Sequence, residues 1–370
     1  MSKKPLLCQF IDDVIDIQDR ESTDPKRFLI EKLKVLSAQE SFCDKQVLML
    51  TSNLDPEADL VGVRLLQRGI DYTRLNIDDI PNNLKIRYTI HQNANLKIEF
   101  VVRGGVLDPS KIPVVLLRNF DMGSISFHDN DLEHAFCFQQ WDDAYRSLQS
   151  NLRCEWINNP DSTIQATDRL GQLSIAKSIG FNIPSTIITN DPIAARNFYY
   201  AYHGNIVLKA LHHHGIEINN KVFCMYSHVV QEQDLRIFND LVYAPCILQQ
   251  RLDKRSDLRV TVVGERIFAV EIDSVSNVKG KDDMHRCQIS ELPKRVINLE
   301  NTIREKCIKL INSLCLKYGA IDFVVDENDH LYFLEVNPTG DWLWIENQTG
   351  IQITEAMVDL IECFYRAHNE

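Results

Sequence analysis

One segment near the C-terminus constrains the fold more than any other part of the sequence. It runs from Gly319 to Pro338 as two apolar stretches around the polar residues 326–329. Apolar stretches of this length on either side of a short polar turn predict a β-hairpin. Acidic residues interrupt these apolar strands, and a carboxylate inside an apolar strand is costly unless it is paired or bound to a metal ion.

The register of this hairpin decides where its acidic side chains lie. If the two ends of the turn pair with each other, Asp322 faces Phe333, and the period-two alternation puts Asp322, Glu335 and Asn337 on one face. Asp322 and Glu335 are then diagonal neighbours, roughly 7–8 Å apart at the backbone. Two acids and an amide offer only oxygen donors, which suit Mg²⁺ because this ion keeps waters and bridges to phosphates. The pattern predicts a magnesium site, and a solvated sheet face that carries acids is the alternative.

Two further segments carry cations on predicted strands. Lys209 ends an apolar strand, where it either enters a site or extends into solvent. A second hairpin is predicted around Gly264, and its alternation places Asp257, Arg259 and Thr261 on one face. Because a guanidinium stays protonated and offers a bidentate fork, Arg259 is the candidate for stabilising charge on a transferring phosphoryl group. A surface ion pair between Arg259 and Asp257 is the alternative.

The hairpin and the residues after it resemble a known family. Asp322, the strand exit at 334–338 and the continuation at 340–346, Gly-Asp-Trp-Leu-Trp-Ile-Glu, resemble the magnesium-binding end of ATP-grasp ligases. The continuation with its tryptophans is similar to the ligases that install ester or amide crosslinks in ribosomal peptides, the microviridin or graspetide type. The resemblance covers roughly residues 45–365 and is strongest from 245 to 350.

The resemblance implies an α/β (α+β) chain with the ATP-grasp fold, in which the nucleotide lies between a central and a C-terminal antiparallel-sheet subdomain. At roughly 150 residues per domain, a chain of 370 residues holds two or three such units. A βαβ unit is predicted at 46–79, and it lacks the Gly-x-Gly-x-x-Gly pattern of a dinucleotide site. The expected parts are an N-terminal extension with an amphipathic helix (1–44), a Rossmann-like pre-grasp domain (45–125), linker helices with the central subdomain (126–245), and the C-terminal subdomain with the magnesium site (246–370).

The resemblance also implies ATP and Mg²⁺ as cofactors and assigns roles to residues. The implied catalytic residues are Arg259 and Lys209, because in the family a lysine at the position of Lys209 holds the nucleotide phosphates. The implied cofactor-binding residues are Arg169, Lys209, Gln249, Gln250, Arg251, Leu252 and Asp257, and the implied metal ligands are Asp322, Glu335 and Asn337. The strand 249–252 is expected to bind adenine through its backbone. Expected substrate contacts are His213, His214, Arg286 and Trp342.

Two loops are candidates for contact with phosphate or substrate. Residues 212–214 are three histidines, which we interpret as a phosphate lid or peptide contact; zinc is disfavoured because neighbouring side chains in an extended loop diverge. The loop at 275–293 carries Lys279, Lys281, His285 and Arg286 and is a candidate for meeting an acidic peptide. A solvated loop is the alternative for this second segment.

The activity that the resemblance implies is ATP-dependent activation of a side-chain carboxylate as an acyl phosphate. A Ser or Thr hydroxyl or a Lys amine of the same precursor peptide then attacks, which closes a macrocycle. The partner is a precursor peptide with a leader and an acidic core, and the family indicates a homodimer. Three alternatives remain: a ligase that adds a free amino acid to a protein or small acid, a nucleotide-binding scaffold without turnover, and a kinase.

Charge and composition argue against several other classes of protein. The net charge of −12, with no compensating Lys/Arg run, disfavours nucleic acid as a partner. No segment reaches the roughly 18 apolar residues of a membrane span, and the acidic N-terminal region does not look like a targeting sequence. Ten cysteines without a Cys-x-x-Cys pair fit reduced thiols in a cytoplasmic protein.

Overall fold

The computed structural model describes most of the chain in several stretches. They are residues 13–16, 46–82, 84–92, 96–102, 105–120, 122–125, 127, 131–211, 215–218, 221–277, 280–286 and 291–368. The amphipathic helix predicted within residues 1–44 lies outside the described residues. Within the described ranges, no helix has both the length and the apolar character needed to cross a membrane.

The N-terminal sheet is parallel and has the strand order β3-β2-β7-β8. Its strands are β2 (Val47–Thr51), β3 (Tyr72–Asn76), β7 (Val114–Leu117) and β8 (Glu155–Ile157). Every residue of β2 is buried, as expected for a parallel strand covered on both faces. Helix α3 (Pro56–Gln67) links β2 to β3 and begins with Asp55 as N-cap and proline at the first turn, so the predicted βαβ unit is confirmed.

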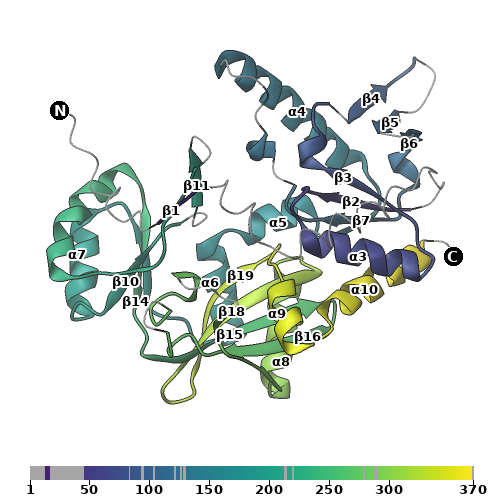
Figure 1. The fold of residues 1–370 in the computed structure, drawn as a ribbon. Helices are drawn as coiled ribbons and strands as arrows, with labels where there is room; N and C mark the ends of the chain where they lie inside the picture. The colour runs from purple at the N-terminus through teal and green to yellow at the C-terminus, as the bar shows by residue number, and fades with distance from the viewer. Residues whose placement is uncertain are drawn as a thin grey trace.

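Smaller elements complete this part of the molecule. An antiparallel sheet holds β4 (Lys85–Thr89), β5 (Lys97–Val102) and β6 (Gly105–Leu107), and the long helix α4 (Asp131–Asn151) leads toward β8. Short 3-10 helices lie at Ile77–Asp79 (η2), Pro109–Lys111 (η3) and Met122–Ser124 (η4). Figure 1 shows α4 extending from the N-terminal sheet on the side away from α3.

The central sheet is antiparallel, with the order β13-β10-β14-β9. Its strands are β9 (Thr186–Thr189), β10 (Ile206–Lys209), β13 (His228–Val229) and β14 (Cys246–Gln250). Helix α7 (Pro192–Ala201) and the 3-10 helix Glu232–Tyr243 (η5) pack against it. Helices α5 (Pro160–Ala166) and α6 (Arg169–Ile179) precede it in the chain, and α6 packs against β19 and α8 of the C-terminal part. A separate small sheet joins β1 (Asp13–Asp16), β12 (Lys221–Cys224) and β11 (Gly215–Ile218).

The C-terminal sheet has five antiparallel strands in the order β17-β16-β15-β18-β19. They are β15 (Lys254–Val263), β16 (Arg266–Ile272), β17 (Lys294–Ile297), β18 (Tyr318–Asp326) and β19 (Leu331–Asn337), with the 3-10 helix Met284–Arg286 (η6) before β17. Helices α8 (Asn301–Ser313), α9 (Leu343–Thr349) and α10 (Ile353–Ala367) follow in sequence. Figure 1 shows α10 returning beside α3, so the chain's last helix packs against its first domain.

The β18–β19 hairpin forms as predicted, but the expected register is wrong. The Asp326 amide donates to the His330 carbonyl at 3.0 Å, and the Asp329 amide donates to the Asp326 carbonyl at 3.1 Å, so Asp326 and His330 close a three-residue turn in which Asp329 has a positive φ of 64°. A register shift then lies between Asp322 and Phe323, so that Asp322 is directly opposite Glu335. The bulge brings the two carboxylates closer than the diagonal arrangement would have done.

A buried amide joins the N-terminal sheet to this hairpin. Asn158 follows β8, is 2 % exposed, and donates to the carbonyls of Tyr318 and Pro338, each at 2.8 Å. Its oxygen accepts from the amides of Lys317 at 2.8 Å and Tyr318 at 3.0 Å. All four hydrogen bonds go to backbone groups at the ends of β18 and β19.

The domain boundaries given above remain a prediction, although β8 lies beyond the expected end of the pre-grasp domain.

Replacing this amide should destabilise the whole protein. Asn158→Ala leaves up to four buried backbone groups without their partner, so we expect a loss of about 3 kcal/mol in the free energy of unfolding. The measurement is a urea unfolding curve followed by circular dichroism. Asn182→Ala is the matched control, because Asn182 is exposed and donates one long bond of 3.3 Å to Leu331. Equal stability of the two variants would contradict the role assigned to Asn158.

Candidate active site

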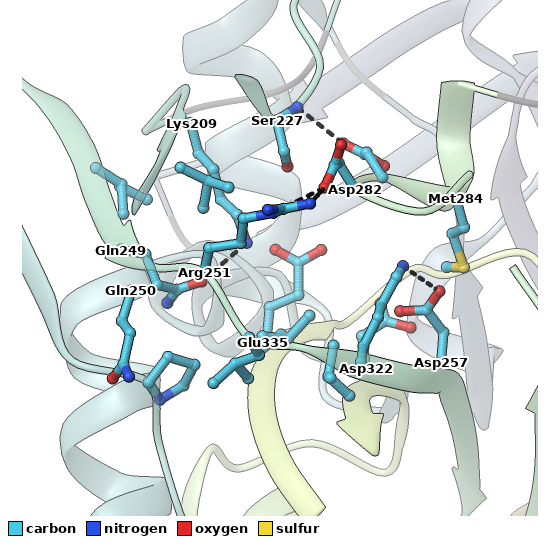
Figure 2. A pocket seen from close by; sticks show the side chains of 18 of the residues that line it. Lys209, Ser227, Gln249, Gln250, Arg251, Asp257, Asp282, Met284, Asp322 and Glu335 are labelled. Atoms are coloured by element: carbon cyan, nitrogen blue, oxygen red, sulfur yellow. Dashed lines mark hydrogen bonds and ion pairs between the residues drawn. The ribbon is translucent and has the colours of Figure 1, made fainter. Parts of the chain in front are cut away.

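A cleft that gathers most of the predicted site residues lies between the central sheet and the C-terminal sheet. Its atom-free space, counted to the open mouth, is about 1240 Å³, which is ample for a nucleotide. Nine of the predicted site residues line it: Arg169, Lys209, Gln249, Gln250, Arg251, Leu252, Asp257, Asp322 and Glu335. Figure 2 shows Lys209 and Gln249 on one side of this cleft and Glu335 pointing into it from the C-terminal sheet.

Two carboxylates and two arginines form the centre of the site. Asp322 and Glu335 lie directly opposite each other on adjacent strands, where like charges repel. Arg259 Nε lies 3.1 Å from Asp322 Oδ1, and Arg169 Nη1 lies 2.6 Å from Glu335 Oε2. The Asp322 side chain is only 11 % exposed, so its charge requires such a partner. Each carboxylate therefore has its own arginine, and the four charges balance.

The alternative pairing of Arg259 with Asp257 does not form. Asp257 accepts from Lys254 Nζ at 2.7 Å and from the Ser274 hydroxyl, which leaves Arg259 to Asp322. Arg259 Nη1 is buried, yet it makes no hydrogen bond to any residue in the described part of the chain. A buried guanidinium nitrogen in this position is available to an oxygen from a ligand.

The donor set fits a magnesium ion. Asn337 pairs with Ala320, two residues before Asp322, so it shares the face of Asp322 and Glu335 as predicted. Within the described ranges, no cluster of three or more His, Cys, Asp or Glu side chains is arranged to hold a metal ion. Mg²⁺ needs no such cluster, because one or two carboxylates with waters and phosphate oxygens complete its shell. Asn337 is exposed and its oxygen accepts from the Thr339 amide at 3.0 Å.

Lys209 points into the cleft from the end of β10. Its Nζ donates to Gln249 Oε1 at 2.9 Å, and Gln249 Nε2 in turn donates to Thr186 Oγ1 at 2.9 Å. Burial lowers the pKa of Lys209, while the negative charges of Glu335 and Asp283 act in the opposite direction. Gln249 therefore orients the ammonium group, a role for its side chain that the sequence did not indicate.

The backbone of strand β14 and its exit is already partly engaged. The Gln250 amide donates to Ser185 O at 2.8 Å, and the Arg251 amide donates to Asn205 O at 3.0 Å. The predicted backbone contact with adenine at 249–252 is thereby restricted to groups other than these two amides. The Arg251 side chain donates from Nε at 2.9 Å and from Nη2 at 2.7 Å to the same oxygen, Oδ1 of Asp282.

The loop at 280–286 contributes acids that the sequence analysis missed. Asp282 pairs with Arg251, and Asp283 Oδ2 accepts from the Ser227 amide at 2.8 Å. Arg286, predicted to contact substrate, donates to Ser227 O at 3.1 Å. The adjacent acids in the sequence could have indicated this contribution, but the prediction for the loop used only its cations. Lys281 lines the cleft, whereas Lys279, His213, His214 and the side chain of His285 lie outside the description.

The prediction that Trp342 contacts substrate is wrong. Trp342 is 0 % exposed, and its Nε1 donates to Thr354 Oγ1 at 3.0 Å. The Arg118 guanidinium lies 4.4 Å from the centre of its ring. The neighbouring Trp344 lies 5.6 Å from Arg259 and is the tryptophan next to the site.

Arg118 is a buried charge that the sequence analysis did not identify. It follows β7, is 2 % exposed, and pairs with Asp55 at 3.0 Å and Asp341 at 2.8 Å. Asp55 is also the N-cap of α3, where it accepts from the Ala58 amide. These contacts attach the segment after β19 to the carboxyl end of the N-terminal sheet.

Comparison with known proteins relates the chain to one family. Residues 166–361 match the model of the RimK-like ATP-grasp domain, which is more than half of the chain. No curated protein sequence matches the chain. The solved structures below are less than 25 % identical to it, so they establish a shared fold.

Three solved structures are similar over nearly their whole length. A RiPP-associated ATP-grasp ligase from Chryseobacterium gregarium, in complex with ADP and a leader and core peptide, has a TM-score of 0.78 and 24 % identity, covering 85 % of this chain and 96 % of that one. Macrocyclase MdnC from Microcystis aeruginosa MRC, bound with precursor peptide MdnA, has a TM-score of 0.76 and 23 % identity, covering 85 % and 98 %. The ATP-grasp ligase PsnB, complexed with minimal precursor, Mg and ADP, has a TM-score of 0.68 and 18 % identity, covering 86 % and 98 %.

Removing one arginine should change the affinity for cation and nucleotide in opposite directions. Arg169→Met leaves the Glu335 carboxylate without its counter-charge, so Mn²⁺ alone should bind roughly three- to tenfold more tightly, whereas ADP with Mg²⁺ should bind more weakly by a similar factor. Isothermal titration calorimetry measures both affinities. Arg146→Met is the control, because Arg146 forms a surface pair with Asp142 at 2.9 Å away from the cleft. A fall in both affinities would argue against the charge balance described here.

Proposed function

The chain belongs to the RimK-like ATP-grasp family and is an ATP-grasp ligase, and from this premise we propose that it crosslinks a ribosomal precursor peptide. In this proposal ATP activates Asp or Glu side chains of the peptide as acyl phosphates. A Ser or Thr hydroxyl or a Lys amine of the same peptide then displaces the phosphate, forming an ester or amide and closing a ring. The observation that carries the proposal is the balanced set of two carboxylates and two arginines in the cleft.

The residues of the cleft divide this work between binding and charge stabilisation. In the proposal Lys209, which Gln249 orients, contacts the nucleotide phosphates, and Arg259 stabilises charge on the phosphoryl group in transfer; the Lys209–Gln249 bond and the unsatisfied Nη1 of Arg259 support these roles. Asp322, Glu335 and Asn337 are the residues that would hold Mg²⁺, which neutralises phosphate oxygens when it is bound. Such a transfer depends mainly on positioning and electrostatics, so no protein nucleophile is required.

The arginine pairs suit residues that would also hold a divalent cation. Arg259 and Arg169 neutralise Asp322 and Glu335. If these carboxylates held Mg²⁺, the ion would supply their positive charge, and the two guanidinium groups would be available to phosphate oxygens.

The relatives support a peptide substrate. The structures most similar in fold include ligases described as bound to a leader and core peptide, to precursor peptide MdnA, and to a minimal precursor. We extend that partner to this chain as a precursor with a leader and an acidic core. We further propose that the enzyme acts as a homodimer in the cytoplasm. Light scattering of the purified protein tests whether it is a dimer.

The test is mass spectrometry of acidic precursor peptides, especially one encoded beside this gene, after incubation with the protein, ATP and Mg²⁺. We expect the loss of one water per crosslink, together with release of ADP and phosphate. Asp322→Asn and Glu335→Gln should each lower the rate of this water loss by at least about a hundredfold, because each removes a proposed metal ligand. Arg146→Met again serves as the variant with unchanged activity.

Other mass changes would replace this function with another. A gain of one amino acid residue would identify a ligase that adds a free amino acid to an acceptor. A gain of phosphate would identify a kinase. Nucleotide binding without a mass change in any peptide would favour a scaffold without turnover.

A further inference from the structure

One aromatic ring beside the site has two cations near it. The Arg259 guanidinium is 5.6 Å from the centre of the Trp344 ring, and Lys294 Nζ is 5.4 Å from the same centre. Trp344 Nε1 donates to the Asp341 carbonyl at 3.0 Å, which fixes the plane of the ring at the start of α9. Arg259 has a predicted role in the transfer, whereas Lys294 has none so far.

The register of the sheet places Lys294 on the same face as the site. Asp257 pairs with Ile272, and Ile272 pairs with Lys294, so these three residues form one row across β15, β16 and β17. Arg259 lies in the adjacent row with Val296, which belongs to the edge strand β17 and is 48 % exposed. The face that carries the carboxylates therefore continues to an edge of the sheet that is open to solvent.

The unsatisfied nitrogen of Arg259 indicates where a ligand oxygen belongs. Arg259 is 94 % buried, and its Nη1 lacks a hydrogen-bond partner among the described residues. A buried donor without an acceptor is costly, and a carboxylate of a ligand would satisfy it. Asp322 and Glu335 line the nucleotide cleft, and Arg259 and Trp344 lie beyond them toward β17.

Lys294 is held at that edge as part of the sheet rather than as a free surface side chain. It is only partly exposed, its Nζ donates to Leu292 O at 3.0 Å, and burial lowers its pKa. A partly desolvated ammonium interacts more strongly with an incoming carboxylate than one in bulk water. The indole of Trp344 offers an apolar surface for the methylene groups that precede such a carboxylate.

We propose that Arg259, Trp344 and Lys294 form the subsite that recognises the acidic side of the substrate. Arg259 binds the carboxylate to be activated, and Lys294 binds an adjoining negative charge of the same peptide. The inference rests on the proposed function and deepens it, because it assigns the selection of acidic peptides to one lysine on the edge strand.

The test compares binding of two small probes to full-length protein loaded with AMP-PNP and Mg²⁺. The probes are N-acetylated, C-amidated tetraglutamate and its uncharged tetraglutamine counterpart, and calorimetry measures their affinities. Lys294→Met should weaken tetraglutamate binding about tenfold, the cost of one charge-assisted contact, and leave AMP-PNP binding unchanged. Lys294→Arg, which keeps the charge, should restore most of the affinity.

A matched control separates recognition from structural support. Lys306 makes the same two kinds of contact as Lys294: its Nζ donates to Gly180 O at 2.8 Å and lies 5.7 Å from the Phe181 ring centre. Lys306→Met should bind tetraglutamate as the wild type does. The proposal is overturned if tetraglutamate fails to bind the wild type, if Lys294→Met binds it equally well, or if Lys306→Met loses as much affinity.

The same variants distinguish this proposal from the proposed function. Probe binding requires no turnover, so a protein that crosslinks no peptide but binds tetraglutamate through Lys294 would refute only the function. Where a precursor peptide is crosslinked, its KM should rise about tenfold in Lys294→Met with little change in kcat. An unchanged KM would refute only the subsite.

Discussion

The repulsion between Asp322 and Glu335 is the constraint on which the rest of the site depends. Two carboxylates directly opposite each other on buried strands are unfavourable unless positive charges offset them. The charges come from two different places: Arg259 from the adjacent strand β15, and Arg169 from the first turn of α6, which precedes the central sheet. The Arg169–Glu335 pair thus adds an ionic contact to the apolar packing of α6 on β19.

Local periodicity explains why much of this arrangement could be predicted from sequence. Side chains alternate along a strand, so the common face of Asp322, Glu335 and Asn337 follows from their spacing alone. The same reasoning placed Lys209 at a strand end and Arg259 on the face of its hairpin. Resemblance to a family with a nucleotide cleft then grouped these residues, and most of them do line one cleft.

The parts that could not be predicted are set by contacts distant in sequence. The extra residue in β19 depends on how the three-residue turn closes, where Asp329 takes a left-handed conformation. The pairing of Arg169 with Glu335 joins residues that no local pattern relates. Trp342 and Trp344 are two positions apart, yet the first is held inside by Thr354 and Arg118 while the second borders the site. Only the assembled fold distinguishes them.

The four bonds of Asn158 have a consequence for recombining this enzyme with its relatives. All partners of this side chain are main-chain groups of residues 317, 318 and 338, at the open end of the β18–β19 hairpin. Any relative whose hairpin has the same shape presents these groups whatever its side chains are. At this contact compatibility is therefore one-sided: the C-terminal half needs only the shape of the hairpin, whereas the N-terminal half needs the asparagine itself.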